Sequence, residues 1–354
     1  MSDTVRYGLA FGLPFLLTLL LTPLARQLAR RLGLVDHPRE HKFHREATPY
    51  LGGLAVGLGV LTVAAVTAGA SSQVLTILVG AVVATMLGLV DDWRGVGPIV
   101  KLLVEASIGV ALWMAGVRAG LFGIEALDLM LTVVWVVAIT NAMNLLDNMD
   151  GIAAGVAAVC AAGFFAIAAT RGDYLVASLA AGVAGGSLGF LRYNFPRARI
   201  FLGDAGSLLL GFLLAALGLK LDLIGQSGVV RAAIAVLIVA VPLFDMMLVI
   251  AARVHDGRPI SRGGTDHTAH RLVFRGLEPR RVAIVAYLVQ FACCVLAYVL
   301  EEAPDPTVLI ATGALAALSL GLLAYVMRME TPTRTVVRLP EAETTNPSWL
   351  RSSR

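Results

Sequence analysis

The chain has 354 residues, of which 58% are hydrophobic and only 15% are charged, and its mean hydropathy is +0.81. Soluble domains usually carry about 25% charged residues, so the composition excludes an ordinary soluble protein and predicts an all-α protein that crosses a membrane several times. The net charge of +4 is spread over short segments between apolar runs, which argues against a nucleic-acid-binding protein.

Eleven apolar segments follow one another along the chain, and each approaches the length of about 20 residues that crosses a bilayer. No short leader with a cleavage site precedes the first segment, so we expect it to be retained. Residues 1–330 are expected to form one transmembrane domain, and residues 331–354, rich in Thr, Pro and Ser, a flexible tail. The predicted spans are residues 7–25, 51–70, 74–90, 100–117, 127–146, 152–170, 174–191, 206–221, 229–250, 282–300 and 307–327.

Basic residues are divided very unevenly between the two sides of this arrangement. The odd-numbered loops and the tail hold 23 of the 28 Lys and Arg residues. Because basic loops stay in the cytoplasm, we expect the N-terminus outside and the C-terminus inside the cell, in the inner (cytoplasmic) membrane. The basic loop at 39–45 is interpreted as part of this topology signal.

Polar residues gather in four segments that all fall on the predicted cytoplasmic side. They are "DDWRGVGPIVK" (91–101), "NAMNLLDNMDG" (141–151), "RYNFPRARIFLGDAGS" (192–207) and "RVHDGRPISRGGTDHTAHRL" (253–272). Carboxylates and amides hardly enter the positive-inside rule, so this coincidence is independent evidence. It predicts a single site at the cytoplasmic surface of the membrane.

The first two segments place acids and amides at the ends of apolar spans. Asp91 and Asp92 lie at a helix C-terminus, where the helix dipole disfavours negative charge, so we expect a cation or another partner beside them. Asn141, Asn144 and Asp147 are spaced three apart and share a helix face, which Asp150 extends. A polar face leaving an apolar span indicates a functional site.

The other two segments combine small or basic residues with single functional groups. Asp204 lies among glycines at the start of a span, where a ligand can approach the backbone and a helix N-terminus favours phosphate; a tight turn with a capping Asp is the competing interpretation. His267 and His270 share their loop with arginines such as Arg258, which suit phosphate binding.

Together these residues favour phosphoryl transfer. Carboxylate and amide oxygens suit Mg²⁺, with Mn²⁺ as an alternative, and the basic groups suit a pyrophosphate. The chain has no Walker A or kinase motif. A metal that binds phosphate oxygens, cations that compensate charge and a carboxylate that positions the nucleophile are what this chemistry requires.

In their order along the chain, these segments resemble the polyprenyl-phosphate N-acetylhexosamine-1-phosphate transferases. The resemblance covers residues 36–275 and includes "DHPREHKFHREATPYLGG", "DDWRG…K", "NAMNLLDNMDG", "YNFPRARIFLGDAGS" and the His-containing loop. It implies a Mg²⁺-dependent enzyme that moves a phospho-sugar from a UDP-sugar to a polyprenyl phosphate and releases UMP. Such a reaction initiates a cell-envelope glycopolymer.

The resemblance also implies roles for individual residues. Asp91 and Asp92 match the pair of which one deprotonates or orients the lipid phosphate, and Asp91 is the favoured base. Asp204 and Asn144 match the metal-binding positions, and Asp147 and Asp150 complete the catalytic motif. The expected substrate-binding residues are Lys101, Asn141, Asn194, Phe201, Arg258, His267 and His270.

Departures from the family pattern indicate the branch. The last loop reads "DHTAHRL", with Ala269 between the histidines, and lacks the run of three histidines of the phospho-MurNAc-pentapeptide translocases. This loop is similar to that of the branch that uses UDP-GlcNAc, so GlcNAc-1-phosphate is the expected group.

Five properties and two alternatives stay open at this point. The identity of the N-acetylhexosamine, the lipid length, the downstream polymer, the oligomeric state, a homodimer included, and the division of base and metal roles between Asp91 and Asp92 are not fixed by the sequence. One alternative is a different donor within the same family, UDP-MurNAc-pentapeptide among them. The other is a cation-coupled transporter, whose acids would be scattered along a central pore, whereas those of a transferase would converge in one pocket.

Overall fold

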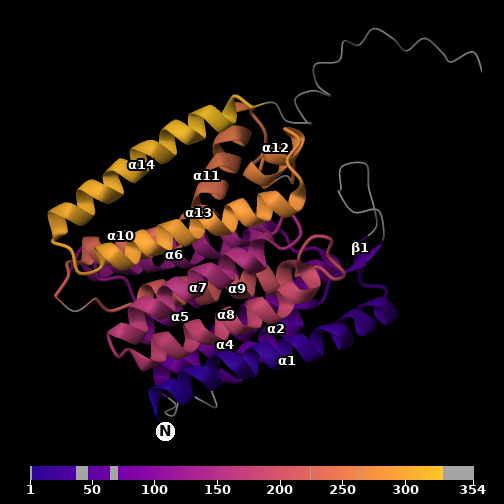
Figure 1. Ribbon diagram of the computed structural model, residues 1–354, viewed down its shortest axis with the longest axis horizontal. Helices are drawn as coiled ribbons and strands as arrows, with labels where there is room; N and C mark the ends of the chain where they lie inside the picture. The colour runs from indigo at the N-terminus through magenta and orange to yellow at the C-terminus, as the bar shows by residue number, and fades with distance from the viewer. Residues whose placement is uncertain (1, 37–46, 64–70, 224, 262, 330–354) are drawn as a thin grey trace, which may run out of the picture.

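The computed structural model describes residues 2–36, 47–63, 71–223, 225–261 and 263–329 (Figure 1). The basic loop at 39–45 and the tail at 331–354, for which the sequence carries predictions, lie outside the described residues. Apart from two strands of two residues each, the secondary structure of the described residues is helical, so the predicted all-α class is confirmed.

The chain order begins with a long helix and a minimal hairpin. Helix α1 (Asp3–Leu32) is followed by β1 (Val35–Asp36) and β2 (Thr48–Pro49), which pair antiparallel. The remaining helices are α2 (Gly52–Leu61), α4 (Ser72–Arg94), α5 (Pro98–Met114), α6 (Glu125–Leu146), α7 (Ile152–Thr170), α8 (Tyr174–Asn194), α9 (Gly203–Lys220), α10 (Gly228–Ile238), α11 (Ala240–His255), α12 (Thr268–Phe274), α13 (Pro279–Leu300) and α14 (Asp305–Met327).

Within the described residues, eight helices are long and apolar enough to cross a membrane, and the bent pair α10–α11 would make a ninth. Among the described residues, ten of the eleven predicted segments each fall mainly on one helix, two of which are short, and the segment at 229–250 falls on two helices. The described part of the segment at 51–70 is α2, with 10 residues, and the segment at 100–117 is α5, with 17 residues. The number of eleven spans, their orientation and the single-domain division therefore stay predictions.

The centre of the bundle is formed by α7, α8 and α9, and α1, α4 and α6 pack around it (Figure 1). Small residues let the helices approach closely, as is common in membrane proteins. A Cβ atom on Gly53 of α2 would lie 2.1 Å from the Gly206 nitrogen, and one on Gly88 of α4 would lie 2.2 Å from the Asp204 carbonyl oxygen. Two helices are thereby packed directly against the first turn of α9.

The segment predicted as one span at 229–250 is broken. Helices α10 and α11 meet at an angle of 80°, and the break leaves backbone groups without partners inside the bundle. The buried amide of Gln290 on α13 replaces those partners: its Oε1 accepts from the Val241 N–H at 3.0 Å, and its Nε2 donates to the Ile238 carbonyl at 2.9 Å. An interrupted helix is tolerated at membrane depth only where such groups are satisfied again.

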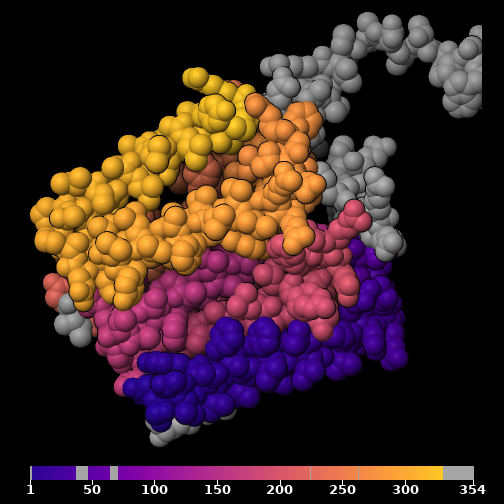
Figure 2. Space-filling view, viewed as in Figure 1, coloured from indigo at the N-terminus to yellow at the C-terminus, as the bar shows by residue number. Residues whose placement is uncertain are grey.

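Helix α14 lies apart from the bundle. Figure 2 shows it in yellow as a separate ridge above α13, and only 6% of its most apolar stretch is buried. Ile310 and Leu318 are 73% and 68% exposed. In a membrane, these side chains would contact hydrocarbon.

Candidate active site

The centre of the candidate site lies where α4 ends and α9 begins. Both carboxylate oxygens of Asp92 accept backbone N–H groups of α9, from Asp204 at 2.9 Å and from Ala205 at 3.2 Å. These are donors of the first helical turn that have no partner within the helix. Gly203 has φ +74°, and a Cβ atom there would lie 2.6 Å from Asp92 Oδ2. Asp92 therefore caps α9 and fixes the position of Asp204.

Asp91 faces a different partner, the ammonium group of Lys101. Lys101 Nζ lies 2.5 Å from Asp91 Oδ2 and 3.0 Å from Asp204 Oδ2. The other oxygen of Asp91 accepts the N–H of Val96 in the turn that leads into α5. The cation expected beside the acid pair is thus Lys101, which is shared between Asp91 and Asp204.

The third helix to reach this point is α6. Asn144 Nδ2 donates to Asp204 Oδ1 and to Ser207 Oγ, both at 2.9 Å. Four helices therefore each contribute one side chain around a single positive charge: Asp91, Lys101, Asn144 and Asp204. Ser207 was not predicted; its position one turn after Asp204 in "GDAGS" is the signal that could have found it.

Asp147 lies just beyond the end of α6 and is partly buried. Burial and the negative charges of Asp204, Asp92 and Asp150 raise the pKa of this carboxyl well above its usual range. A group of acids that repel one another in this way favours a bound cation.

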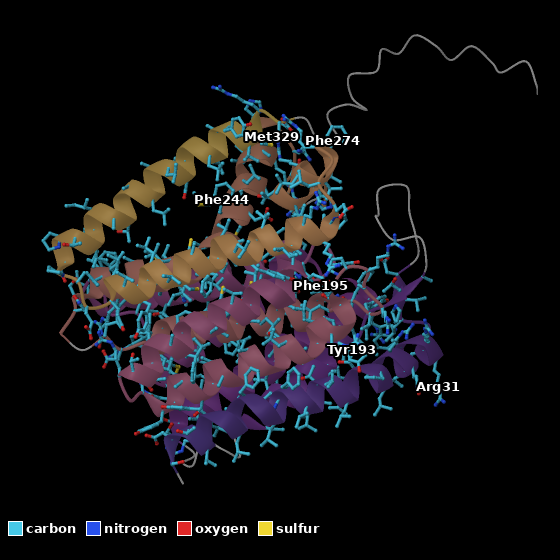
Figure 3. All side chains as sticks on the ribbon, in the orientation of Figure 1. Arg31, Tyr193, Phe195, Phe244, Phe274 and Met329 are labelled. Carbon is cyan, nitrogen blue, oxygen red and sulfur yellow. The ribbon has the colours of Figure 1, made fainter. Side chains whose placement is uncertain are left out.

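Asp150 and Asn194 connect the loop after α6 to the loop before α9. Asp150 Oδ2 accepts the N–H of Ala198 at 2.8 Å. Asn194 accepts the N–H of Gly151 at 2.9 Å and donates to the Ile200 carbonyl at 3.0 Å. These contacts fix the shape of the site wall. Figure 3 shows the neighbours Tyr193 and Phe195 at this same end of the bundle.

Phe201 and Asn141 also have defined places. Phe201 forms a parallel bridge with Tyr50, and its N–H donates to the Pro49 carbonyl at 2.8 Å. Asn141 Nδ2 donates to Glu105 of α5 and to the carbonyl of Val137. Phe201 therefore lies two residues before the first residue of α9, and Asn141 is bonded to α5, one turn before Asn144.

The remaining predicted residues form a second cluster around two acids that the sequence did not single out as site residues. Arg258 donates through both Nη atoms to Asp266, at 2.6 and 3.0 Å, and the Asp266 hydrogen bonds raise the pKa of its guanidinium further. Burial alone would raise the pKa of Asp266, but Arg258 and Arg253 lower it below its usual range. Arg258 is thus bound within the protein in this structure.

The two histidines of this cluster lie side by side, with ring centroids 5.5 Å apart. Nδ1 of His267 lies 2.8 Å from Oδ2 of Asp245 on α11. His270 is 8% exposed, and its burial, together with the neighbouring His267, lowers its pKa to about 4. His270 is therefore neutral at physiological pH.

The two clusters lie at the same end of the bundle, on either side of the start of α13 (Figure 1). The Tyr287 hydroxyl of α13 donates to the Gly151 carbonyl at 2.7 Å, and Arg280 lies over the Phe195 ring at 5.5 Å. The short helix α12, which follows His267, leads directly into α13. The first turns of α13 thus connect the His loop to the wall of the Asp204 site.

The oxygen atoms at this site are of the kind that hard divalent cations prefer. The carboxylates of Asp91 and Asp204 already share one positive charge, and the carboxamide of Asn144 lies beside Asp204. Among the described residues, no group of three or more His, Cys, Asp or Glu is arranged to hold a metal ion. Mg²⁺ is usually bound by one or two carboxylates together with water and substrate phosphates. Asp204 and Asn144 would suffice for such a site.

Comparison with known proteins agrees with this architecture of apolar helices and a polar site at their ends. Residues 74–222 match the model of glycosyl transferase family 4. The chain is 36% identical to a probable undecaprenyl-phosphate N-acetylglucosaminyl 1-phosphate transferase of Bacillus subtilis, over 77% of this chain and 78% of the relative. It is 35% identical to a decaprenyl-phosphate N-acetylglucosaminephosphotransferase of Mycobacterium leprae, over 73% and 74% of the two chains.

The protein is therefore a multi-pass membrane transferase, as its fold and relatives together show. It belongs to glycosyl transferase family 4, among the polyprenyl-phosphate N-acetylhexosamine-1-phosphate transferases, which confirms the resemblance seen in the sequence. Over a shorter part of its length, the chain is also similar to a phospho-N-acetylmuramoyl-pentapeptide-transferase of a Synechococcus species, at 37% identity over 52% of this chain and 59% of the relative.

Proposed function

We propose that this protein transfers N-acetylhexosamine-1-phosphate, and specifically GlcNAc-1-phosphate, from a UDP-sugar to a polyprenyl phosphate at the cytoplasmic face of the inner membrane. The products are polyprenyl-diphosphate-GlcNAc and UMP, and the reaction starts a cell-envelope glycopolymer. The observation that carries this proposal is the meeting of Asp91, Lys101, Asn144 and Asp204 from four helices around one charge.

This arrangement suits an attack of one phosphate on another. An oxygen of the lipid phosphate attacks the sugar-bearing phosphorus of the UDP-sugar, and the bond from that phosphorus to the oxygen of UMP breaks. Asp91, which is paired with Lys101, orients the lipid phosphate and accepts its proton when it carries one. The Lys101 ammonium compensates the negative charge that gathers as the two phosphates approach.

A divalent cation, Mg²⁺ or Mn²⁺, would be held by Asp204 and by the amide oxygen of Asn144. When bound, it would neutralise phosphate oxygens and make UMP a better leaving group. Asp92 serves this step indirectly, because it holds the first turn of α9 and hence Asp204 in place.

Two observations support a GlcNAc donor and an enzyme over their alternatives. The relatives similar to this chain over about three quarters of its length are named as N-acetylglucosamine-phosphate transferases, whereas the likeness to the pentapeptide transferase covers 52% of the chain. The acids of a cation-coupled transporter would be scattered along a pore, and here Asp91 and Asp204 share a single lysine.

The test is UMP release by the purified full-length protein with undecaprenyl phosphate, UDP-GlcNAc and Mg²⁺. We expect lipid-dependent UMP that EDTA abolishes and added Mg²⁺ restores. Asp204→Ala should remove this activity, while the matched variant Asp222→Ala, at an exposed ion pair with Arg231, should retain it.

Two results would count against the proposal. Full activity of Asp204→Ala would refute the metal assignment. No UMP from UDP-GlcNAc, UDP-GalNAc, UDP-QuiNAc or UDP-MurNAc-pentapeptide would refute the transferase and favour transport.

A further inference from the structure

Asp245 is a buried acid that the proposed reaction does not yet use. It lies on α11, six residues after the break at Val239, and is 2% exposed. Its Oδ2 is 2.8 Å from His267 Nδ1, and its Oδ1 accepts the N–H of Thr268 at 2.8 Å. Each carboxylate oxygen therefore contacts the segment that carries the histidines.

The contact with Asp245 decides which nitrogen of His267 carries the proton. A carboxylate can only accept a hydrogen bond, so Nδ1 must be the protonated nitrogen, and in the neutral ring Nε2 keeps its lone pair. No hydrogen bond from a described residue reaches Nε2 of His267. That lone pair is available to a ligand.

The neighbouring arginines pair with Asp266, so the side chain that Asp245 contacts is that of His267. The other buried acid of the cluster, Asp266, is compensated by Arg253 and Arg258. Asp245, in contrast, is bonded to His267 and to a backbone N–H of Thr268. His270, the second ring beside His267, is neutral at physiological pH, as described above, and so adds no charge.

We propose that Asp245 is a positioning residue that fixes His267 as its Nδ1–H tautomer, so that Nε2 accepts a hydrogen bond from the sugar of the donor substrate. A diphosphate at neutral pH offers no hydrogen to accept, whereas the hydroxyl and acetamido N–H groups of an N-acetylhexosamine do. His267 then recognises the sugar and not the phosphates. This inference rests on the proposed function.

The tautomer is measured first, because it does not depend on activity. Full-length protein labelled with ¹⁵N-histidine is reconstituted in liposomes at pH 8, and the ring nitrogens are observed by solid-state NMR. The chain has 6 histidines, so single His→Gln variants assign each signal. We expect His267 as its Nδ1–H tautomer. A ring protonated at Nε2, or at both nitrogens, would overturn the proposal.

Asp245→Asn separates the effect of Asp245 on the His267 tautomer from its hydrogen bond with the Thr268 N–H. Asparagine still offers an oxygen to the Thr268 N–H, but its NH₂ group donates to Nδ1 and so favours the Nε2–H tautomer. We expect the ¹⁵N signals to report this exchange. We also expect the KM for UDP-GlcNAc to rise about tenfold, as for one lost hydrogen bond, with little change in kcat.

A double-mutant cycle shows whether Asp245 acts through His267. His267→Ala alone should raise the KM for UDP-GlcNAc about as much as Asp245→Asn, and the double variant should show no further loss. Additive losses would overturn the proposal, as would an unchanged KM in Asp245→Asn. The matched control is Asp173→Asn, the same change at the cap of α8, which should leave KM and the His267 signals unchanged.

Failure of the inference is distinguishable from failure of the proposed function. An inactive wild-type protein with His267 protonated at Nδ1 refutes the transferase and leaves the pairing of Asp245 and His267 standing. An active wild-type protein with the other tautomer refutes this inference alone. If Asp245→Asn does not fold, two measurements still test the inference. They are the ¹⁵N spectrum of the wild-type protein and the KM of His267→Ala for UDP-GlcNAc.

Discussion

Asp91 and Asp92 are neighbours in the chain, yet they serve different purposes. Successive residues of a helix point about 100° apart, so Asp91 is directed to Lys101 on α5 and Asp92 to the first turn of α9. The first is bound to the Lys101 ammonium, which a substrate can displace, and to the single backbone N–H of Val96. The second is bound to two backbone N–H groups that remain in place.

This difference predicts different losses on substitution. Asp92→Ala removes a cap, which costs about 1–2 kcal/mol of unfolding free energy, and releases Asp204, so we expect both a lower denaturation midpoint and no UMP release. Asp91→Ala leaves the Lys101–Asp204 pair intact and should lose turnover with a smaller change in stability. Thermal denaturation in detergent, measured beside UMP release, checks this. Equal destabilisation by the two variants would contradict it.

His270 predicts a dependence of stability on pH. Burial lowers its pKa to about 4, below the usual value of about 6.5. Between these values the unfolded chain binds the proton more readily, so stability is complete above about pH 6.5 and is lost as the pH falls towards 4. The full loss is at most about 3 kcal/mol.

The measurement is the denaturation midpoint of wild type and His270→Gln at a series of pH values. Other acids also titrate in this range, so the difference between the two proteins is the relevant quantity. It should change between pH 6.5 and 4 and level off above pH 7. Parallel curves for the two proteins would show that burial of His270 does not have this effect.

At the level of helices, hydropathy located the apolar segments well and missed one break. The segment at 229–250 is apolar throughout, so hydropathy predicts one span. Pro242 was the available signal, because proline cannot donate to the preceding turn and belongs in the first turn of a helix; it lies there in α11. The partner that satisfies the break, Gln290, is on α13 and invisible to any local pattern.

Gln290 predicts the stability of the break. Gln290→Leu would leave the Val241 N–H and the Ile238 carbonyl unpaired in an apolar interior, at about 1–3 kcal/mol for each group. We expect a loss of about 2–4 kcal/mol of unfolding free energy and, because α11 carries Asp245, a raised KM for UDP-GlcNAc. Gln27→Leu, at an exposed position of α1, is the control. A denaturation midpoint for Gln290→Leu equal to that of the control would contradict this role.

For the molecule as a whole, spacing along the chain predicted which residues gather, and tertiary packing decided how they are paired. Asp91, Asn144 and Asp204 were predicted from helix ends and a shared helix face, and the structure brings them together. Glu105 with Asn141, and Asp245 with His267, are pairings between separate segments. No local pattern fixes them, because they depend on which helices become neighbours.

The peripheral helix α14 is connected to the His loop by one buried arginine. Arg271 is 0% exposed, and its Nη1 donates to the carbonyls of Val326 and Met329 at the end of α14, at 2.9 and 3.0 Å. Its Nε donates to the Asp266 carbonyl at 2.8 Å. Figure 3 shows Met329 beside Phe274 of α12. The end of α14 is thus bonded to the loop that holds His267.

Because little of α14 is covered by protein, we expect its tilt to respond to the thickness of the surrounding bilayer. A helix longer than the hydrocarbon layer tilts to bury its apolar length, and such a tilt would move the carbonyls that bind Arg271 and, with them, the loop that carries His267. We expect the KM for UDP-GlcNAc to vary with lipid acyl-chain length in reconstituted vesicles, and less so in Arg271→Gln. A KM independent of acyl-chain length would show that the position of α14 does not affect the loop that carries His267. A KM that varies with chain length would mean that membrane composition changes how tightly the protein binds UDP-GlcNAc.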